Sequence, residues 1–172
     1  MKYMFISDVH GNIEYLEECI KIFENENAKK LIILGDTSAY LDKEQNEMVA
    51  NILNNIKNKV EVIRGNCDTY DFEEKLEFEI FDIDNLYLNG KFITITHGHY
   101  YNYYELPENC GEIFIQGHTH IPMLQKINDK IIANPGSVTK PRGSDLRCYI
   151  IIDEGKIELK TLDGKLVKKI VF

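Results

Sequence analysis

The chain lacks the features that mark membrane and secreted proteins. Among its 172 residues there is no apolar run of about 18, the length that a membrane-spanning helix needs. Met1 leads directly into an apolar, strand-like segment and not into a signal peptide. We therefore expect a soluble, cytoplasmic protein with no membrane partner.

Paired cysteines and an excess of basic residues are also absent. The four cysteines of the chain are scattered and form no C-x-x-C pair, which argues against a zinc knuckle and against a disulfide framework. With 20 basic residues against 28 acidic ones the net charge is −8, so no nucleic-acid polymer is expected as a partner. A phosphate-bearing substrate is still compatible, because bound metal cations can reverse the charge inside one cleft.

No linker, repeat or low-complexity segment divides the chain, so we predict a single domain over residues 1–172. In the first half, apolar runs at 2–7, 29–36 and 59–66 predict strands. Apolar residues at helical spacing predict amphipathic helices over about 12–27 and 48–56. This βαβαβ order is typical of a mainly parallel sheet with helices packed on it.

After Asp71 the pattern becomes strand-rich. Apolar runs at 78–83, 86–98, 112–118, 123–134, 147–162 and 165–172 predict strands, and turn dipeptides such as Asn89-Gly90 join several into hairpins. We expect this half to supply a second sheet. The predicted fold class is α/β, in one domain of two sheets.

Polar side chains with metal-binding chemistry follow five of the predicted strands. All five histidines of the chain lie in these strand-end motifs. Ligands of open α/β sheets collect at the carboxyl ends of strands, where loops converge on one point. Any one such histidine is weak evidence, but the shared location predicts a common site.

The spacing within these motifs also favours a common site. In an extended backbone residues i and i+2 point to the same side, so Asp8 with His10, and His118 with His120, can reach toward one cavity. Imidazole with carboxylate and amide oxygens suits Mn²⁺, Fe²⁺, Zn²⁺ or Ni²⁺ better than Mg²⁺ or Ca²⁺. Seven ligands are too many for one tetrahedral ion and fit two ions that share a carboxylate; the candidates are Asp8, His10, Asp36, Asn66, His97, His118 and His120.

The order Asp-x-His, Gly-Asp, Gly-Asn, His-Gly, Gly-His-x-His resembles the calcineurin-like metallophosphoesterase superfamily. The small size and the later "NPGS" resemble its YfcE-like branch of bacterial and archaeal phosphodiesterases. The resemblance implies a dinuclear site in a β-sandwich of two mixed sheets flanked by helices. It implies a first metal held by Asp8, His10, Asp36 and His120, and a second held by Asp36, Asn66, His97 and His118, with Asp36 as the bridge.

Two departures from the family pattern bear on the activity. The protein phosphatases of the superfamily carry Gly-Asp-x-x-Asp-Arg-Gly, where this chain has "GDTSAY" without the second Asp and the Arg. Many members carry a histidine after the Asn of the third motif, where this chain has Cys67. A thiol, with its reference pKa of about 8.5, is a poorer general acid than imidazole, so Cys67 is interpreted as a weak substitute or a pocket-shaping group.

Three further features keep alternatives open. His99 either points to the leaving group beside His97 or bonds within its loop, and Arg142 either binds a substrate phosphate or is an exposed loop residue. The run "YYNYY" from Tyr100 to Tyr104 suits a leaving-group pocket or a surface contact. The terminal hairpins and these tyrosines are compatible with a homodimer or homotetramer.

Together these residues predict a metal-dependent phosphodiesterase acting on a small phosphodiester. A hydroxide between two divalent ions, with Mn²⁺ favoured and Zn²⁺, Fe²⁺ or Ni²⁺ as alternatives, would attack in line while Asn66 helps to hold the phosphoryl group. Two other hypotheses are a phosphomonoesterase on a small metabolite and a non-catalytic scaffold resembling the retromer subunit of this branch.

Overall fold

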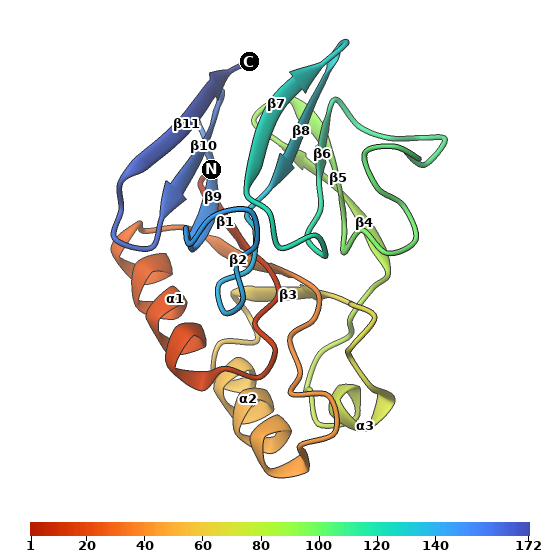
Figure 1. The fold of residues 1–172 in the computed structure, drawn as a ribbon, viewed down its shortest axis with the longest axis vertical. Coiled ribbons are helices and arrows are strands. Elements are labelled where there is room, and N and C mark those ends of the chain that lie inside the picture. Colours follow the sequence, from red (N-terminus) through yellow and green to blue (C-terminus); the bar gives the residue numbers. More distant parts are fainter.

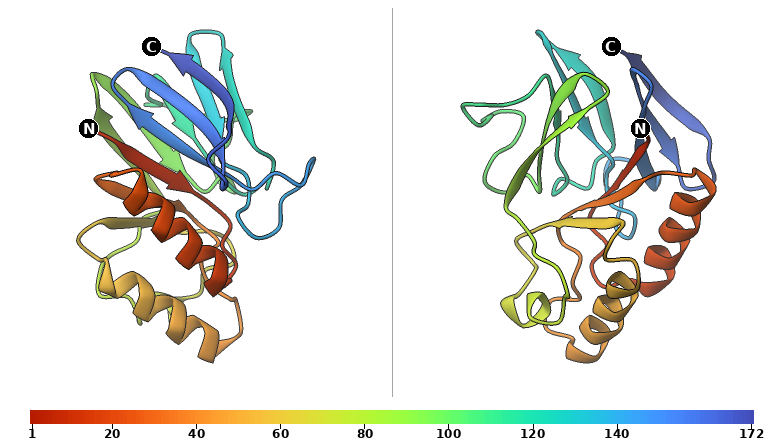
Figure 2. Two further views of the ribbon diagram at one scale, coloured as in Figure 1. Left: turned by 90° about the vertical axis from the view of Figure 1, so that its left-hand side faces the viewer. Right: turned by 180° about the vertical axis from the view of Figure 1, so that it is seen from behind.

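The computed structural model describes residues 1–172, whose strands form two facing sheets with the helices gathered against one end and side of the first sheet (Figures 1 and 2). The first sheet has six strands in the order β11-β10-β9-β1-β2-β3, and the second has five in the order β4-β5-β6-β8-β7. The first-sheet strands are β1 (Tyr3–Ile6), β2 (Lys30–Leu34), β3 (Val60–Ile63), β9 (Cys148–Asp153), β10 (Lys156–Thr161) and β11 (Leu166–Val171). The second-sheet strands are β4 (Ile83–Leu88), β5 (Lys91–Thr96), β6 (Ile113–Ile115), β7 (Met123–Ile127) and β8 (Lys130–Asn134).

The predicted βαβαβ half is confirmed. Strands β1, β2 and β3 pair in parallel, and α1 (Ile13–Asn25) and α2 (Lys43–Asn55) connect them. Asn12 caps α1 by accepting from the backbone N–H of Tyr15 at 3.0 Å. Helix α2 begins earlier than predicted, because Asp42 caps it by accepting from the N–H of Gln45 at 3.0 Å. No helix has the length and apolar character needed to cross a membrane.

The second half differs from the prediction in three places. Residues 78–83 do not form a strand: Phe81 makes only an isolated bridge to Ile63, and β4 begins at Ile83. A short helix, α3 (Tyr70–Glu73), was not predicted. The last three strands join the first sheet and not the second, as predicted for this half, and β9 pairs antiparallel with β1. An apolar pattern reports burial and not the identity of the neighbouring strand, so the sequence could not assign this pairing.

Two apolar layers hold the sandwich together. On β1, Met4 and Ile6 face the helices and pack with Leu16 and Phe23 of α1, whereas Phe5 faces the second sheet. Side chains alternate between the faces of a strand, and here both faces are covered, which explains the unbroken apolar runs of the central strands. The mixed two-sheet sandwich is confirmed, with its helices on the first sheet only.

This architecture brings several strand ends to one end of the sandwich. The parallel strands β1, β2 and β3 of the first sheet end beside β5 and β6 of the second, which are also parallel to each other (Figure 1). The segments that follow these strands carry the polar motifs of the sequence. The two sheets therefore deliver those motifs to a common edge.

A carboxylate on β3 makes the stability of the fold depend on pH. Oε1 of Glu61 is buried without a hydrogen-bond partner, and Nζ of Lys30 lies 3.7 Å from Oε2. Burial, followed by the neighbouring carboxylate of Asp84, raises the pKa of Glu61 to about 7. Protonated Glu61 therefore contributes stability that is complete below its unfolded-state pKa of about 4.3 and is lost as the pH rises through about 7.

Glu61→Gln should remove this pH dependence. Between pH 6 and pH 8 the free energy of unfolding of the parent protein should fall by about 1 kcal/mol more than that of the variant. Urea denaturation at the two pH values measures the difference, with Glu108→Gln in an exposed loop as the matched control. Equal pH slopes for the parent and Glu61→Gln would show that Glu61 titrates alike in the folded and unfolded chains.

Candidate metal centre

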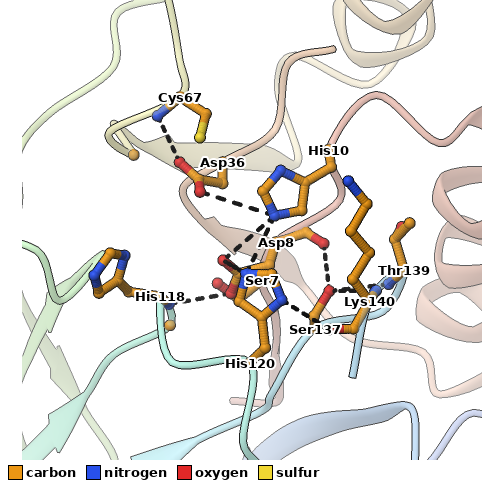
Figure 3. A network of polar contacts seen from close by, with 12 residues as sticks. Ser7, Asp8, His10, Asp36, Cys67, His118, His120, Ser137, Thr139 and Lys140 are labelled. Atoms are coloured by element: carbon orange, nitrogen blue, oxygen red, sulfur yellow. Dashed lines mark hydrogen bonds and ion pairs between the residues drawn. The ribbon is translucent and has the colours of Figure 1, made fainter. Parts of the chain in front are cut away.

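Four of the predicted ligands converge at the ends of β1 and β2 and in the segment after β6 (Figure 3). Each offers a ligand atom, and these atoms lie within 4.8 Å of one another. Nε2 of His120 is 3.2 Å from Oδ1 of Asp8 and 3.3 Å from Nε2 of His10. We call Asp8, His10, Asp36 and His120 the first ligand group.

The other predicted ligands lie on the far side of Asp36. Nε2 of His97 is 3.2 Å from Oδ1 of Asn66 and 3.4 Å from Oδ1 of Asp36. The ring centroids of His97 and His118 are 5.0 Å apart. We call Asp36, Asn66, His97 and His118 the second ligand group.

Asp36 offers one carboxylate oxygen to each group. Oδ2 lies 3.9 Å from Nε2 of His10, and Oδ1 faces His97. The backbone N–H of Cys67 donates to Oδ1 at 2.8 Å, which fixes the orientation of the carboxylate. A carboxylate in this position can bridge two metal ions.

Backbone carbonyls orient two of the imidazoles. Nδ1 of His97 is 2.7 Å from the carbonyl oxygen of Leu34, and Nδ1 of His120 is 2.7 Å from that of Lys140. Since a carbonyl only accepts, Nδ1 carries the proton in both rings and Nε2 is directed into the site as a potential ligand.

The surroundings of the candidate ligands shift their pKa values in both directions. Burial lowers the pKa of His10 and of His118. Burial acts in the same direction on His97, but the carboxylates of Asp36 and Asp8 together with the carbonyl of Leu34 outweigh it, and the pKa of His97 is raised. The neighbouring carboxylate of Asp8 raises the pKa of His120. Burial would raise the pKa of Asp36, but His97 holds it well below its ordinary value.

The residues present fit divalent metal ions. Oδ1 of Asp8 is buried and has no hydrogen-bond partner, an arrangement that is costly in a protein interior and that a cation would satisfy. Around it the two groups offer imidazole nitrogens, carboxylate oxygens and one amide oxygen, the donor set that suits first-row transition metals.

The backbone at the ligands is left-handed, not extended. The φ angles are 56° at Asp8, 48° at His10, 50° at Asp36, 66° at His118 and 63° at His120. The backbone at the i, i+2 pairs is therefore not extended as predicted, although Nε2 of His10 lies 3.9 Å from Oδ1 of Asp8. Left-handed conformation is unfavourable for residues other than glycine and costs on the order of 1 kcal/mol each, and such strain clusters at functional sites.

Two glycines permit the motifs to approach each other closely. A Cβ on Gly65 would lie 2.1 Å from the backbone nitrogen of Asp36, and one on Gly117 would lie 1.8 Å from Oγ of Ser7. The glycines before Asn66 and His118 therefore serve the packing of neighbouring strand ends.

The "NPGS" segment anchors the site through residues that the sequence analysis did not assign. Oγ of the buried Ser137 donates to the backbone carbonyl of Asp8 at 2.8 Å. Nδ2 of Asn134 donates to the carbonyl of Gly117 at 2.7 Å and to Oγ1 of Thr119 at 3.0 Å. The motif itself was visible in the sequence, but its partners come from distant segments.

A cavity of about 430 Å³ opens onto the two ligand groups. It is lined by His10, Asp36, Asn66, Cys67, His118, Thr119, His120 and Arg142. A larger cavity of about 500 Å³, around Arg64 and Tyr70, contains none of the predicted ligands. The structure thus places Cys67 and Arg142 at the candidate site.

Cys67 and His99 differ in their relation to this cavity. Burial, followed by the carboxylate of Asp36, raises the pKa of the Cys67 thiol to about 12. The ring of His99 stacks on Tyr100 with centroids 4.0 Å apart and lies 5.3 Å from the ring of His97. Its Nδ1 is buried without a partner, and His99 does not line the cavity.

A family model, the calcineurin-like phosphoesterase superfamily domain, matches residues 1–156. The chain belongs to this superfamily. It is 31% identical to phosphodiesterase YfcE of Escherichia coli K12 over 175 aligned residues, which cover 97% of this chain and 95% of YfcE. It is also 31% identical to phosphodiesterase MJ0936 of Methanocaldococcus jannaschii, over 79% of this chain and 83% of that protein.

Two solved structures share the architecture. The Escherichia coli YfcE phosphoesterase superposes with a TM-score of 0.88 at 29% identity, covering 99% of both chains. A zinc complex of Vps29 from Entamoeba histolytica has a TM-score of 0.65 at 19% identity and covers 99% of both chains. The latter likeness shows the shared fold.

Asp68→Asn should destabilise the loops that carry Asp36 and Asn66. Oδ1 of Asp68 accepts from the N–H groups of Thr37 and Ser38, and Oδ2 accepts from that of Gly65, each at 2.8 Å. An amide cannot accept all three, so we expect a loss of about 1–3 kcal/mol in the free energy of unfolding.

Chemical denaturation measures this loss, and Asp145→Asn in an exposed loop is the matched control. A loss for Asp68→Asn no larger than that of the control would contradict a positioning role for this carboxylate.

Proposed function

We propose that the chain is a metal-dependent phosphodiesterase with a dinuclear site formed by the two ligand groups. The observation that carries the proposal is the carboxylate of Asp36, with Oδ2 toward the first group and Oδ1 toward the second. Similarity to two phosphodiesterases over most of the chain supports the same reaction class.

Two divalent ions, when bound, would neutralise charge on the phosphate and lower the pKa of a shared water to near 7. Mn²⁺ is our preferred ion, and Zn²⁺, Fe²⁺ and Ni²⁺ suit the same donors. The protein supplies the fixed geometry: carbonyls hold His97 and His120, and the N–H of Cys67 holds Asp36. Preorganisation of this kind lowers the cost of binding charge in the transition state.

Asn66 and Arg142 are the proposed substrate contacts. Asn66 is exposed and its Oδ1 stays 3.2 Å from His97; one N–H of its amide points to Sγ of Cys67, so the other is available to a phosphoryl oxygen. Arg142 lines the same cavity, where its guanidinium can form paired hydrogen bonds to a substrate phosphate beside the one that is held at the two ligand groups. Since His99 does not line the cavity, we assign it a positioning role beside His97 in place of contact with the leaving group.

A small phosphodiester is the preferred substrate over a monoester. The segment after Asp36 contributes no basic side chain, and the N–H groups of Thr37 and Ser38 are already taken by Asp68. A monoester dianion would need additional positive charge on this side, whereas a diester carries one negative charge.

Loss of Asp36 or His97 should abolish diester hydrolysis. Chelator-stripped protein should recover hydrolysis of bis(4-nitrophenyl) phosphate on addition of Mn²⁺. Asp36→Asn and His97→Ala should then lose at least about 100-fold in kcat/KM, because each removes a ligand to the proposed ions. Circular dichroism checks the fold of each variant, and Asp145→Asn serves as a control.

Three other results would overturn the assignment. Full retention of activity in Asp36→Asn would contradict the bridging role. Preferential cleavage of 4-nitrophenyl phosphate would indicate a phosphomonoesterase. Tight Mn²⁺ binding in calorimetry without turnover of either ester would favour the non-catalytic scaffold.

Cys67→Ala should reduce kcat/KM for the diester by less than about tenfold, whereas loss of a true general acid costs about 10²–10⁴-fold. Nδ2 of Asn66 lies 3.4 Å from Sγ, and burial followed by the carboxylate of Asp36 raises the pKa of the thiol to about 12, so the thiol shapes the pocket and is a poor proton donor. Steady-state kinetics with Cys110→Ala as the control measures the effect. A loss of about 100-fold or more would assign proton donation to Cys67.

A further inference from the structure

Two basic side chains, Lys140 and Arg142, border the candidate metal centre from one short segment. Arg142 lines the cavity, and the side chain of Lys140 extends alongside the ring of His10 in Figure 3. The resemblance to the superfamily implies no metal ligand in this segment, and of its residues only Arg142 is a candidate from the sequence.

The backbone of this segment is fixed to the first ligand group. The N–H of Lys140 donates to Oγ of Ser137 at 2.8 Å, and its carbonyl oxygen is the partner of Nδ1 of His120. The N–H of Arg142 donates to the carbonyl oxygen of His120 at 2.9 Å. Both basic residues are therefore held at a defined position relative to the proposed metals.

Their side chains are available for a ligand. Lys140 and Arg142 are exposed, and neither charged group makes an ion pair or hydrogen bond within the chain. Among the residues that line the cavity, Asp36 is the only carboxylate and Arg142 is the only lysine or arginine. Lys140, two residues before Arg142, adds a second positive side chain beside the cavity, in a chain whose net charge is −8.

A simple diester does not need these two charges. Two divalent ions already outweigh the carboxylates of Asp8 and Asp36, and a diester brings a single negative charge. Two free cations on one wall match a separate dianion, and the guanidinium fork is suited to phosphate.

We propose that Lys140 and Arg142 form a second phosphate subsite, so that the preferred substrate is a phosphodiester that also carries a phosphomonoester group. This inference rests on the proposed phosphodiesterase function. The scissile diester would lie at the two ligand groups, and the additional phosphate would bind on the wall formed by residues 140–142.

A matched pair of chromogenic diesters tests the subsite. Thymidine 5′-(4-nitrophenyl phosphate) is compared with its 3′-phosphorylated form, using the full chain loaded with Mn²⁺. The parent protein should prefer the 3′-phosphorylated diester by about tenfold in kcat/KM, and the preference should shrink as ionic strength rises. The double variant Lys140→Gln/Arg142→Gln should bring the ratio of the two kcat/KM values close to one, while Lys126→Gln on the exposed part of β7 should keep the parent ratio.

Calorimetry gives the same comparison without turnover. Thymidine 3′,5′-bisphosphate should bind the Mn²⁺-loaded protein more tightly than thymidine 5′-monophosphate, by about tenfold, and the double variant should lose this difference. Tighter bisphosphate binding in a protein that cleaves no diester would refute the proposed function and support the subsite. Equal affinity of the parent protein for both nucleotides, or an equal loss of affinity for both in the double variant, would overturn the subsite. If both diesters were still cleaved, the proposed phosphodiesterase function would be unaffected.

Discussion

The carboxylate of Asp36 is the group that joins the first and the second ligand group of the candidate centre. Asp36 follows β2, which lies between β1 and β3 in the first sheet, so the ligands from all three strand ends are placed relative to it. The N–H of Cys67, at the end of β3, holds Oδ1 in place, and Oδ2 is left toward His10. The second sheet must bring His97 within 3.4 Å of the same carboxylate. The candidate centre therefore forms only when the two sheets pack against each other in this relative position.

That packing also has to offset an unfavourable local arrangement. Five predicted ligands adopt left-handed backbone conformations, and the buried Oδ1 of Asp8 lacks a hydrogen bond. Each costs free energy in the metal-free chain. The compensation lies in the two apolar layers, in which residues such as Phe5 and Met4 of the same strand are fully buried on opposite faces. Metal binding would add to this compensation, because ions that bind only the folded chain stabilise it.

The sequence predicted the strand ends better than the strand partners. Apolar runs located β1, β2 and β3, and the polar residue after each run indicated the site, because both signals are local. The return of β9 to pair with β1 depends on contacts between residues about 150 positions apart, which no local pattern encodes. For the same reason the anchoring role of Ser137 was not predicted, although its motif was noticed. His99 is the reverse case, in which a local pattern suggests a role that the structure does not support. It has the residue type and position of a site residue, but its ring lies against Tyr100.

The segment from Asn134 to Arg142 has two roles: its first part holds the ligand-bearing loops in place, and its last part carries positive charge beside the cavity. Its first part is buried, and short polar side chains there bind backbone groups of other motifs: Ser137 holds Asp8 and Asn134 holds Gly117. Its last part contributes backbone groups to His120 but leaves the long side chains of Lys140 and Arg142 unpaired at the surface. A change of those side chains would alter the potential at the cavity without moving a ligand. A change at Ser137 would disturb the ligands directly. Substrate preference can therefore vary on this fold while the metal centre stays constant.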